Sequence, residues 1–232
     1  MSETIKDNLA SVKERIQNAA TRTGRNPDDI TLVVVSKTFA PEIVQQAVDA
    51  GVRVLGENKV QEAVEKAPLV KGDGINWHLI GHLQSNKVRP AVKTFAWIHT
   101  IDGCELAQRL DRIAGEEGRT IDVLIQVDLA REATKSGADV SELAAIVETL
   151  DAANNLRLQG LMVLPPFFED VEKTRPYFKR LREILDEVNR TRPEAKKLTQ
   201  LSMGMSHDFE VAIEEGATLV RVGSAIFGER GK

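Results

Sequence analysis

The chain has 232 residues, of which 42% are hydrophobic and 28% charged, and its formal net charge is -4. This weakly acidic balance gives no electrostatic reason to bind nucleic acid or an anionic membrane, so neither is expected as a partner. A single cysteine, Cys104, excludes an intramolecular disulfide and a multi-cysteine zinc site, and it suits a reducing cytoplasm. The polar N-terminus does not resemble a signal peptide, and no apolar run approaches the roughly 20 residues of a membrane span.

Helical and strand patterns alternate along the whole chain. An amphipathic helix is expected first, at 4–23. Short apolar strands are then expected at 31–35, 52–55, 76–80, 96–101, 121–129, 156–164, 198–203 and 219–222. Helices are expected between them, at 41–50, 59–70, 87–94, 105–117, 140–150, 171–191 and 209–215, and residues 225–227 follow the last strand.

Strict alternation of eight strands with helices in 232 residues predicts an α/β fold, a single (β/α)8 TIM barrel preceded by an extra helix. No low-complexity linker divides the chain, so one domain spanning 1–232 is expected. An open doubly wound sheet is the alternative, but no G-x-G-x-x-G follows the first strand.

Lys37 follows the first strand, a β-branched run that predicts a strand buried on both faces. At that position the amine would lie at the edge of an apolar wall, where loss of hydration favours the neutral, nucleophilic form. The alternative is a lysine whose stem covers apolar surface while its ammonium reaches water.

Polar residues at the carboxyl ends of barrel strands converge on one mouth, whatever their separation in sequence. Phosphate sites of barrels commonly lie beside the last two strands, where Gly204 and Gly223 would allow close approach and Ser202 and Ser224 offer hydroxyls. Ordinary small residues in turns are the alternative. A phosphate cradle beside a strand-end lysine is typical of a pyridoxal 5′-phosphate (PLP) site, or of a lysine-imine aldolase for a phosphorylated sugar.

Six blocks make this pattern more specific. They are V-V-S-K-T (34–38), G-E-N-K-V-Q-E (56–62), W-H-L-I-G-H-L-Q-S-N-K (77–87), T-K-S-G (134–137), L-S-M-G-M-S-H-D (201–208) and V-R-V-G-S-A-I-F-G (220–228). In order and spacing they resemble the pyridoxal phosphate homeostasis protein family, the YggS type, also called proline synthetase co-transcribed homologues. That family is similar to the N-terminal barrel of alanine racemase but lacks its C-terminal β domain.

The resemblance implies PLP as cofactor, held as an internal aldimine on Lys37, with Arg221 at the pyridine nitrogen. It implies that the phosphate is held by Ser202, Gly223 and Ser224. Asn58 would lie near the cofactor ring or its 3′-hydroxyl. The resemblance assigns no role to His82.

Arg221 has a consequence for chemistry. PLP is a strong electron sink when its pyridine nitrogen is protonated, as beside an Asp, and a permanent cation at that nitrogen does not keep it protonated. A two-base racemase also needs a second acid or base opposite the lysine. Alanine racemase takes a tyrosine from the domain absent here, whereas Tyr177 is expected on a helix outside the barrel. We therefore expect a PLP-binding protein of intracellular vitamin B6 homeostasis and amino-acid balance rather than an efficient catalyst. The alternative is a weak PLP-dependent amino-acid racemase.

Apo-enzymes that need PLP are candidate partners, and Lys135 could accept the cofactor transiently during transfer; the alternative is a solvated loop lysine. Absence of the racemase β domain, which carries the dimer interface, favours a monomer. A zinc pair of His78 and His82 is disfavoured, since one lies on a strand and the other in its exit loop. His99 is interpreted as structural, and Asp208 as the cap of the helix that follows it.

Overall fold

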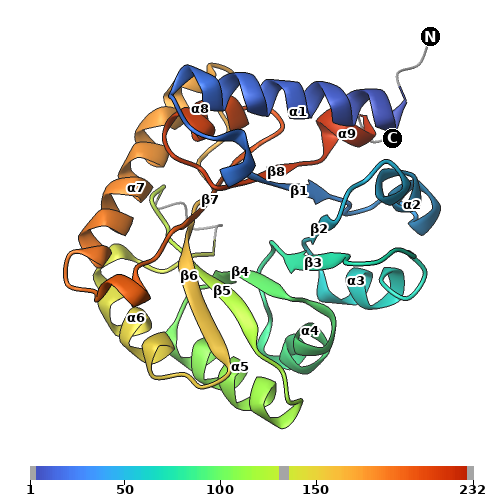
Figure 1. Ribbon diagram of the computed structural model, residues 1–232. Coiled ribbons are helices and arrows are strands. Elements are labelled where there is room, and N and C mark those ends of the chain that lie inside the picture. The colour runs from blue at the N-terminus through green and yellow to red at the C-terminus, as the bar shows by residue number, and fades with distance from the viewer. Residues whose placement is uncertain (1–3, 131–135, 229–232) are drawn as a thin grey trace.

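Figure 1 shows a ring of strands surrounded by helices. The structure, a computed structural model, describes residues 4–130 and 136–228. In these residues eight parallel strands close into a barrel, each paired with the next and β8 paired with β1. The strands are β1 (Thr31–Val35), β2 (Val54–Glu57), β3 (Asn76–Leu79), β4 (Trp97–Ile101), β5 (Ile121–Gln126), β6 (Leu156–Met162), β7 (Gln200–Met205) and β8 (Leu219–Val222). The helices are α1 (Ile5–Arg22), α2 (Pro41–Asp49), α3 (Val60–Lys66), α4 (Val88–Thr94), α5 (Cys104–Glu116), α6 (Leu143–Asp151), α7 (Arg175–Asn189), α8 (Phe209–Glu214) and α9 (Ser224–Phe227).

The predicted (β/α)8 barrel with an additional N-terminal helix is confirmed. β1 and β8 have the predicted bounds, whereas β2 and β7 begin two residues later than predicted. Pairing decides the bounds of β2, because Ser36 N–H donates to Gly56 O at 3.0 Å and Ile80 N–H donates to Glu57 O at 2.9 Å. Glu57 is thus part of a strand and points to the opposite face from Gly56.

Several other elements are shorter than predicted, and in three of them the local sequence or pairing gives the reason. The helix predicted at 59–70 is limited to Val60–Lys66, since Pro68 has no N–H to donate inside a helix. β5 ends at Gln126 because the next residue, Val127, makes only an isolated bridge to Ala138. β6 ends before Pro165 and Pro166, which lack ladder donors.

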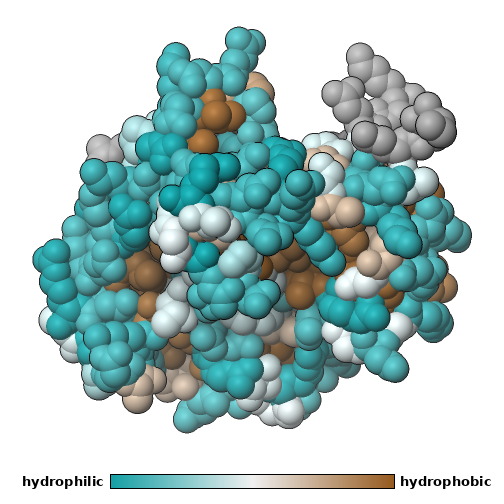
Figure 2. Space-filling view, turned by 45° about the horizontal axis from the view of Figure 1, so that its top comes forward, coloured by the Kyte–Doolittle hydropathy of each residue, from teal (hydrophilic) through white to brown (hydrophobic). Residues whose placement is uncertain are grey.

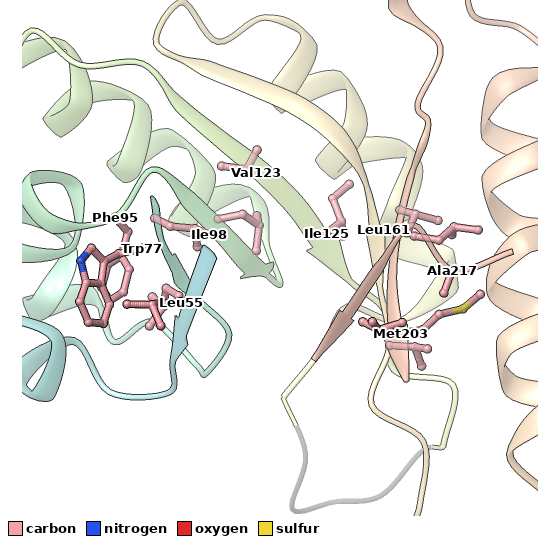
Figure 3. Packing of buried hydrophobic residues seen from close by; sticks show 14 of the residues in the cluster. Leu55, Trp77, Phe95, Ile98, Val123, Ile125, Leu161, Met203 and Ala217 are labelled. Carbon is pink, nitrogen blue, oxygen red and sulfur yellow. The ribbon is translucent and has the colours of Figure 1, made fainter. Parts of the chain in front are cut away.

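The larger hydrophobic core lies between the barrel and the helices. Figure 3 shows part of this layer, in which Leu55, Trp77 and Ile98 from three strands lie close to Phe95. Alternate strand residues face the other way, and a separate small cluster fills the barrel interior with Val33, Leu124, Met162 and Leu219. The interior also contains buried polar side chains, namely His78, His99, Ser202 and Arg221.

Helix α1 runs across α8 and α9 in the upper part of Figure 1. It begins with a capping box, in which Thr4 and Asp7 bond to each other's backbone N–H. Its Arg15 pairs with Glu210 at 2.8 Å, and Asn8 Nδ2 donates to Ile226 O at 3.0 Å. The N-terminal helix therefore anchors the short helix that follows β8.

The face drawn in Figure 2 is mostly hydrophilic, with hydrophobic residues visible mainly in recesses between hydrophilic ones. Among the described residues, no helix has the length and apolar character needed to cross a bilayer.

Candidate functional site

A cavity of about 450 Å³ opens where β1, β2, β3, β6, β7 and β8 end. This volume lies in the usual range of small-molecule sites, and in parallel barrels such sites lie at this face. The cavity is lined by Val35, Lys37, Phe39, Asn58, Ile80, Gly81, Leu164, Met205, Ser206, His207, Arg221, Gly223, Ser224 and Gly228. Barrel closure thus brings together residues from both ends of the chain.

Five of the six residues predicted to bind the cofactor line this cavity: Lys37, Asn58, Arg221, Gly223 and Ser224. The sixth, Ser202, is fully buried and is not one of the lining residues. It faces the barrel interior from β7, and its Oγ accepts a hydrogen bond from Arg221 Nη1 at 2.7 Å. Its observed contact is therefore with another predicted site residue rather than with the cavity.

Lys37 occupies a tight turn directly after β1. Phe39 N–H donates to Ser36 O at 3.2 Å and closes the turn, and Lys37 is its second residue. The third residue, Thr38, has φ +70°, in the left-handed region. The half-buried Lys37 is thereby directed from the end of β1 to the cavity wall.

Gly223 brings the end of β8 against the end of β1. A Cβ atom at this position would lie 3.0 Å from Val35 O, so a side chain would push the two strands apart. Ser224 begins α9 directly afterwards. The glycine therefore allows the backbone of residues 223–224 to line the same cavity as Lys37.

Asn58 offers an unused polar group. Its Oδ1 is buried and has no hydrogen-bond partner among the described residues. Gly81 packs so closely on it that a Cβ there would lie 2.2 Å from Asn58 O, which fixes the backbone beside this amide. Buried polar atoms normally have a partner, so an unsatisfied one that lines a cavity marks a contact for a ligand.

Arg221 is almost completely buried on β8, and burial lowers the pKa of its guanidinium to about 10. At neutral pH it is still protonated and can only donate. Its Nη1 donates to Ser202 Oγ and its Nη2 to Val163 O at 3.0 Å. The nearby Asp208 carboxylate raises the pKa of Arg221 and so opposes the effect of burial.

A buried chain of polar contacts continues from Arg221 through the barrel. Ser202 Oγ accepts from Arg221, so its hydroxyl proton is available for His99 Nδ1 at 2.9 Å. His99 then carries its proton on Nε2 and donates it to His78 Nδ1, also at 2.9 Å. Burial lowers the pKa of His78 to about 3, and burial, then His78 and Arg221, lower that of His99 well below its usual value. Both imidazoles are therefore neutral at neutral pH.

These hydrogen bonds agree with the structural role predicted for His99 and show which residues it contacts. Two inward-facing strand residues, His99 and Ser202, connect the barrel interior to the guanidinium that lines the cavity. The sequence signal was a histidine inside an apolar strand, but its partner lies 103 residues away. Only the closed barrel shows the pairing.

Sequence reasoning also missed the part played by Ser206. Its Oγ accepts hydrogen bonds from the backbone N–H groups of Gly223, at 3.1 Å, and Ala225, at 3.4 Å. It thus ties the exit of β7 to the start of α9 within the cavity. The available signal was a hydroxyl two residues after Gly204, whose φ is +89°.

Asp208 corrects one expectation. It is the first flanking residue of α8, but its side chain makes no capping hydrogen bond to that helix. Its Oδ1 instead accepts from Met205 N–H at 2.7 Å. The carboxylate therefore stabilises the turn that carries Ser206 instead of the start of α8.

Other predicted residues lie away from the cavity or outside the described chain. His82 Nδ1 is 3.3 Å from Asp102, and Tyr177 lies on α7 against Phe168. Lys135 falls outside the described residues. Among the residues that are described, no group of three His, Cys, Asp or Glu side chains is placed to hold a metal ion.

Comparison with known proteins agrees with this architecture. The family described as alanine racemase, N-terminal domain, matches residues 8–231. A pyridoxal phosphate homeostasis protein of Aquifex aeolicus is 43% identical over 224 residues, covering 97% of both chains, and that of Escherichia coli K12 is 41% identical over 230 residues, again covering 97% of both. The chain belongs to the pyridoxal phosphate homeostasis protein family, within the alanine racemase N-terminal domain family.

Solved structures give the same result. PipY of Synechococcus elongatus PCC7942, solved with PLP bound, is 40% identical with a TM-score of 0.85, and covers 97% of this chain and 100% of its own. Alanine racemase of Clostridium difficile is 18% identical with a TM-score of 0.70, and the match covers 97% of this chain and 58% of that one. This second likeness concerns the fold alone.

Proposed function

We propose that this chain binds PLP covalently through Lys37 and acts in intracellular PLP homeostasis and amino-acid balance, as one functional domain over 1–232. The observation that carries the proposal is a lysine amine and a buried guanidinium on the wall of one cavity of about 450 Å³. Membership of a family named for PLP homeostasis, and the PLP-bound PipY structure, support the same cofactor.

The residues of the cavity fit this cofactor. When bound, PLP supplies an aldehyde carbon that condenses with a primary amine to a C=N bond, with loss of one water. Lys37 is the lysine on the cavity wall within the described residues, and the unsatisfied amide of Asn58 suits the ring hydroxyl. The guanidinium of Arg221 has more N–H donors than its two observed acceptors, so it can also donate to a ring nitrogen.

The phosphate is proposed to bind at residues 223–224. Gly223, which packs against the end of β1, and Ser224 both line the cavity there, and Ser224 adds a hydroxyl. The Ser206 hydroxyl is close enough to join them, since it already contacts Gly223 N–H. For Ser202 a direct phosphate contact stays a prediction, and its bond to Arg221 favours a role in orienting the guanidinium.

Arg221 also favours storage over turnover. Its pKa of about 10 keeps the guanidinium protonated at neutral pH. It would therefore donate a hydrogen bond to the ring nitrogen but would not transfer a proton to that nitrogen. The two histidines behind it are neutral and provide no further acid. These charges support the proposal that the protein stores the cofactor rather than turning over substrate efficiently.

Absorbance spectroscopy and hydride trapping test the proposal. The protein incubated with PLP should show visible absorbance from the cofactor bound to lysine, and mass spectrometry after borohydride reduction should find the adduct on Lys37. Lys37→Ala should abolish both. An adduct on another residue, or a colourless protein as expected for a sugar-phosphate aldolase, would refute the proposal.

A weak racemase is the second candidate, because His207 also lines the cavity. Its Nε2 lies 3.2 Å from Phe168 O and Glu169 O, so this nitrogen donates and Nδ1 is left as a possible base. Incubation of the loaded protein with single L-amino acids in deuterated water separates the two functions. Catalytic exchange of the α-proton that His207→Gln removes would favour the racemase.

The oligomeric state and the partners of the protein form a separate part of the proposal. We propose a cytoplasmic monomer that gives PLP to apo-enzymes, with Lys135 as a transient acceptor. Mixing the loaded protein with an apo-transaminase should restore transaminase activity faster than spontaneous release of PLP allows. Lys135→Ala should slow this transfer, and sedimentation should report the mass of one chain.

A further inference from the structure

Three charged side chains form a cluster outside the barrel wall, beneath α3. Lys66 Nζ lies 2.6 Å from Glu57 Oε1 and 3.0 Å from Glu62 Oε1. The Glu57 side chain is fully buried, that of Lys66 is 5% exposed, and that of Glu62 is 24% exposed. These residues lie in or just after the G-E-N-K-V-Q-E block, and none of them lines the cavity.

A buried ion pair adds little to stability, because desolvation of the charges offsets most of their attraction. The cluster is nevertheless directed at one short segment. Ser36 Oγ donates to Glu57 Oε1 at 2.7 Å, and Lys66 Nζ donates to Ser36 O at 2.8 Å. Thr38 N–H donates to Glu62 Oε1. Both neighbours of Lys37 are therefore held, one on each side.

The segment that the cluster holds is strained. Thr38 has φ +70°, and a β-branched residue rarely adopts this conformation. It is exposed to solvent, and its backbone N–H is fixed by the Glu62 carboxylate. Release of that N–H would allow the turn to relax to an ordinary conformation and would rotate the residue before it.

We propose that Glu57, Glu62 and Lys66 are positioning residues, which hold the Ser36–Thr38 turn so that Lys37 Nζ points into the cavity. This inference rests on the proposed function, since it concerns the bond between Lys37 and PLP. The cluster does not touch the part of the cavity that would hold the ring nitrogen or the phosphate. It therefore governs formation of the covalent bond rather than noncovalent recognition.

Two ligands separate these effects. PLP can bond to Lys37, whereas pyridoxine 5′-phosphate has the same ring and phosphate with an alcohol in place of the aldehyde. Glu62→Met, which removes the acceptor of Thr38 N–H, should weaken PLP binding about tenfold, as expected for a lost charge-assisted hydrogen bond. It should leave the affinity for pyridoxine 5′-phosphate unchanged.

Glu65→Met is the matched control, because Glu65 is an exposed carboxylate on the same helix whose partner is Gln61. It should change neither affinity. Lys66→Met is a second variant with the same expected result as Glu62→Met: weaker binding of PLP and unchanged binding of pyridoxine 5′-phosphate. Thr38→Asn in the Glu62→Met background should restore part of the PLP affinity, since asparagine tolerates the left-handed region.

Equal weakening for both ligands would show that the cluster merely supports the fold, and would overturn the inference. So would unchanged PLP affinity in Glu62→Met and Lys66→Met. If the unaltered protein forms no trapped adduct on Lys37, the proposed function falls and the inference falls with it. If the adduct forms on Lys37 but the Glu62→Met and Lys66→Met variants bind PLP as tightly as the unaltered protein, the inference falls and the proposed function stands.

Discussion

Arg221 illustrates how single residues in this barrel depend on distant partners. A buried guanidinium needs acceptors, and here a hydroxyl and a carbonyl supply them. The hydroxyl in turn requires an acceptor of its own, which His99 provides in its neutral form. Protonating His99 would remove that acceptor and place a second cation beside the guanidinium.

This dependence predicts acid sensitivity. The unfolded chain protonates histidine near pH 6.5, while folded His78 has a pKa of about 3 and that of His99 is also lowered. The unfolded state therefore binds more protons below pH 6.5, and stability falls as pH falls through this window. Between pH 7 and pH 5 the loss from His78 should be about 2 kcal/mol, and the lowered pKa of His99 should add to it.

Denaturant unfolding at the two pH values measures this loss. In His78→Gln, the free energy of unfolding that is lost between pH 7 and pH 5 should be smaller by the contribution of His78. His82→Gln serves as the control for replacing a histidine at an exposed position. A pH dependence that both variants retain in full would contradict the neutral buried pair.

The junction between β7 and α8 shows how one element determines the start of the next. Gly204 has φ +89°, and a Cβ there would lie 2.6 Å from Ala212 Cβ and 2.9 Å from Phe209 Cα. α8 can pack against β7 only because this side chain is missing. The turn that follows carries Ser206 and His207 to the cavity.

Gly204→Ala should therefore destabilise the protein by about 3 kcal/mol, from backbone strain and overpacking together. Gly24→Ala is the matched control: Gly24 also has a positive φ, +68°, but no atom lies within 4 Å of its added Cβ. It should lose only about 1 kcal/mol. Equal losses in denaturant unfolding would mean that the contact with α8 does not constrain the junction.

In the molecule as a whole, the barrel combines an apolar outer layer with polar groups at its mouth. Hydrophobic side chains fill the layer between strands and helices, and polar groups collect inside and at the strand ends. The N-terminal helix bonds to α9, next to the proposed phosphate site, so the start of the chain supports its far end. Ligand binding at the mouth should consequently stabilise the entire fold.

PLP at 100 times its dissociation constant should raise the free energy of unfolding by about 2.7 kcal/mol, if it binds only the folded state. Thermal unfolding with and without the cofactor measures this gain. In Lys37→Ala the same PLP concentration should give a smaller gain, because the covalent part of the binding is lost. An equal gain in both proteins would place the binding elsewhere.

Much of this architecture was predictable because local patterns carry it. The helices and strands follow from periodicity, and β1 and β8 matched in full, since buried β-branched runs have clear limits. β2 was misplaced by two residues, because hydrogen bonds to its neighbours, not its own composition, decide where it ends. The placement of Glu57 in a strand could not be read from the chain alone.

The sequence by itself determined the alternation of strands and helices, the lysine at the end of the first strand and the membership of the family, since each is read from residue types and their order along the chain. Only the tertiary structure decided that Ser202 faces Arg221, that His99 contacts Ser202, and that Lys66 donates to the carbonyl of Ser36, the residue before Lys37. These contacts join residues far apart in the chain. They depend on strand register and on which face each side chain takes, and barrel closure fixes both.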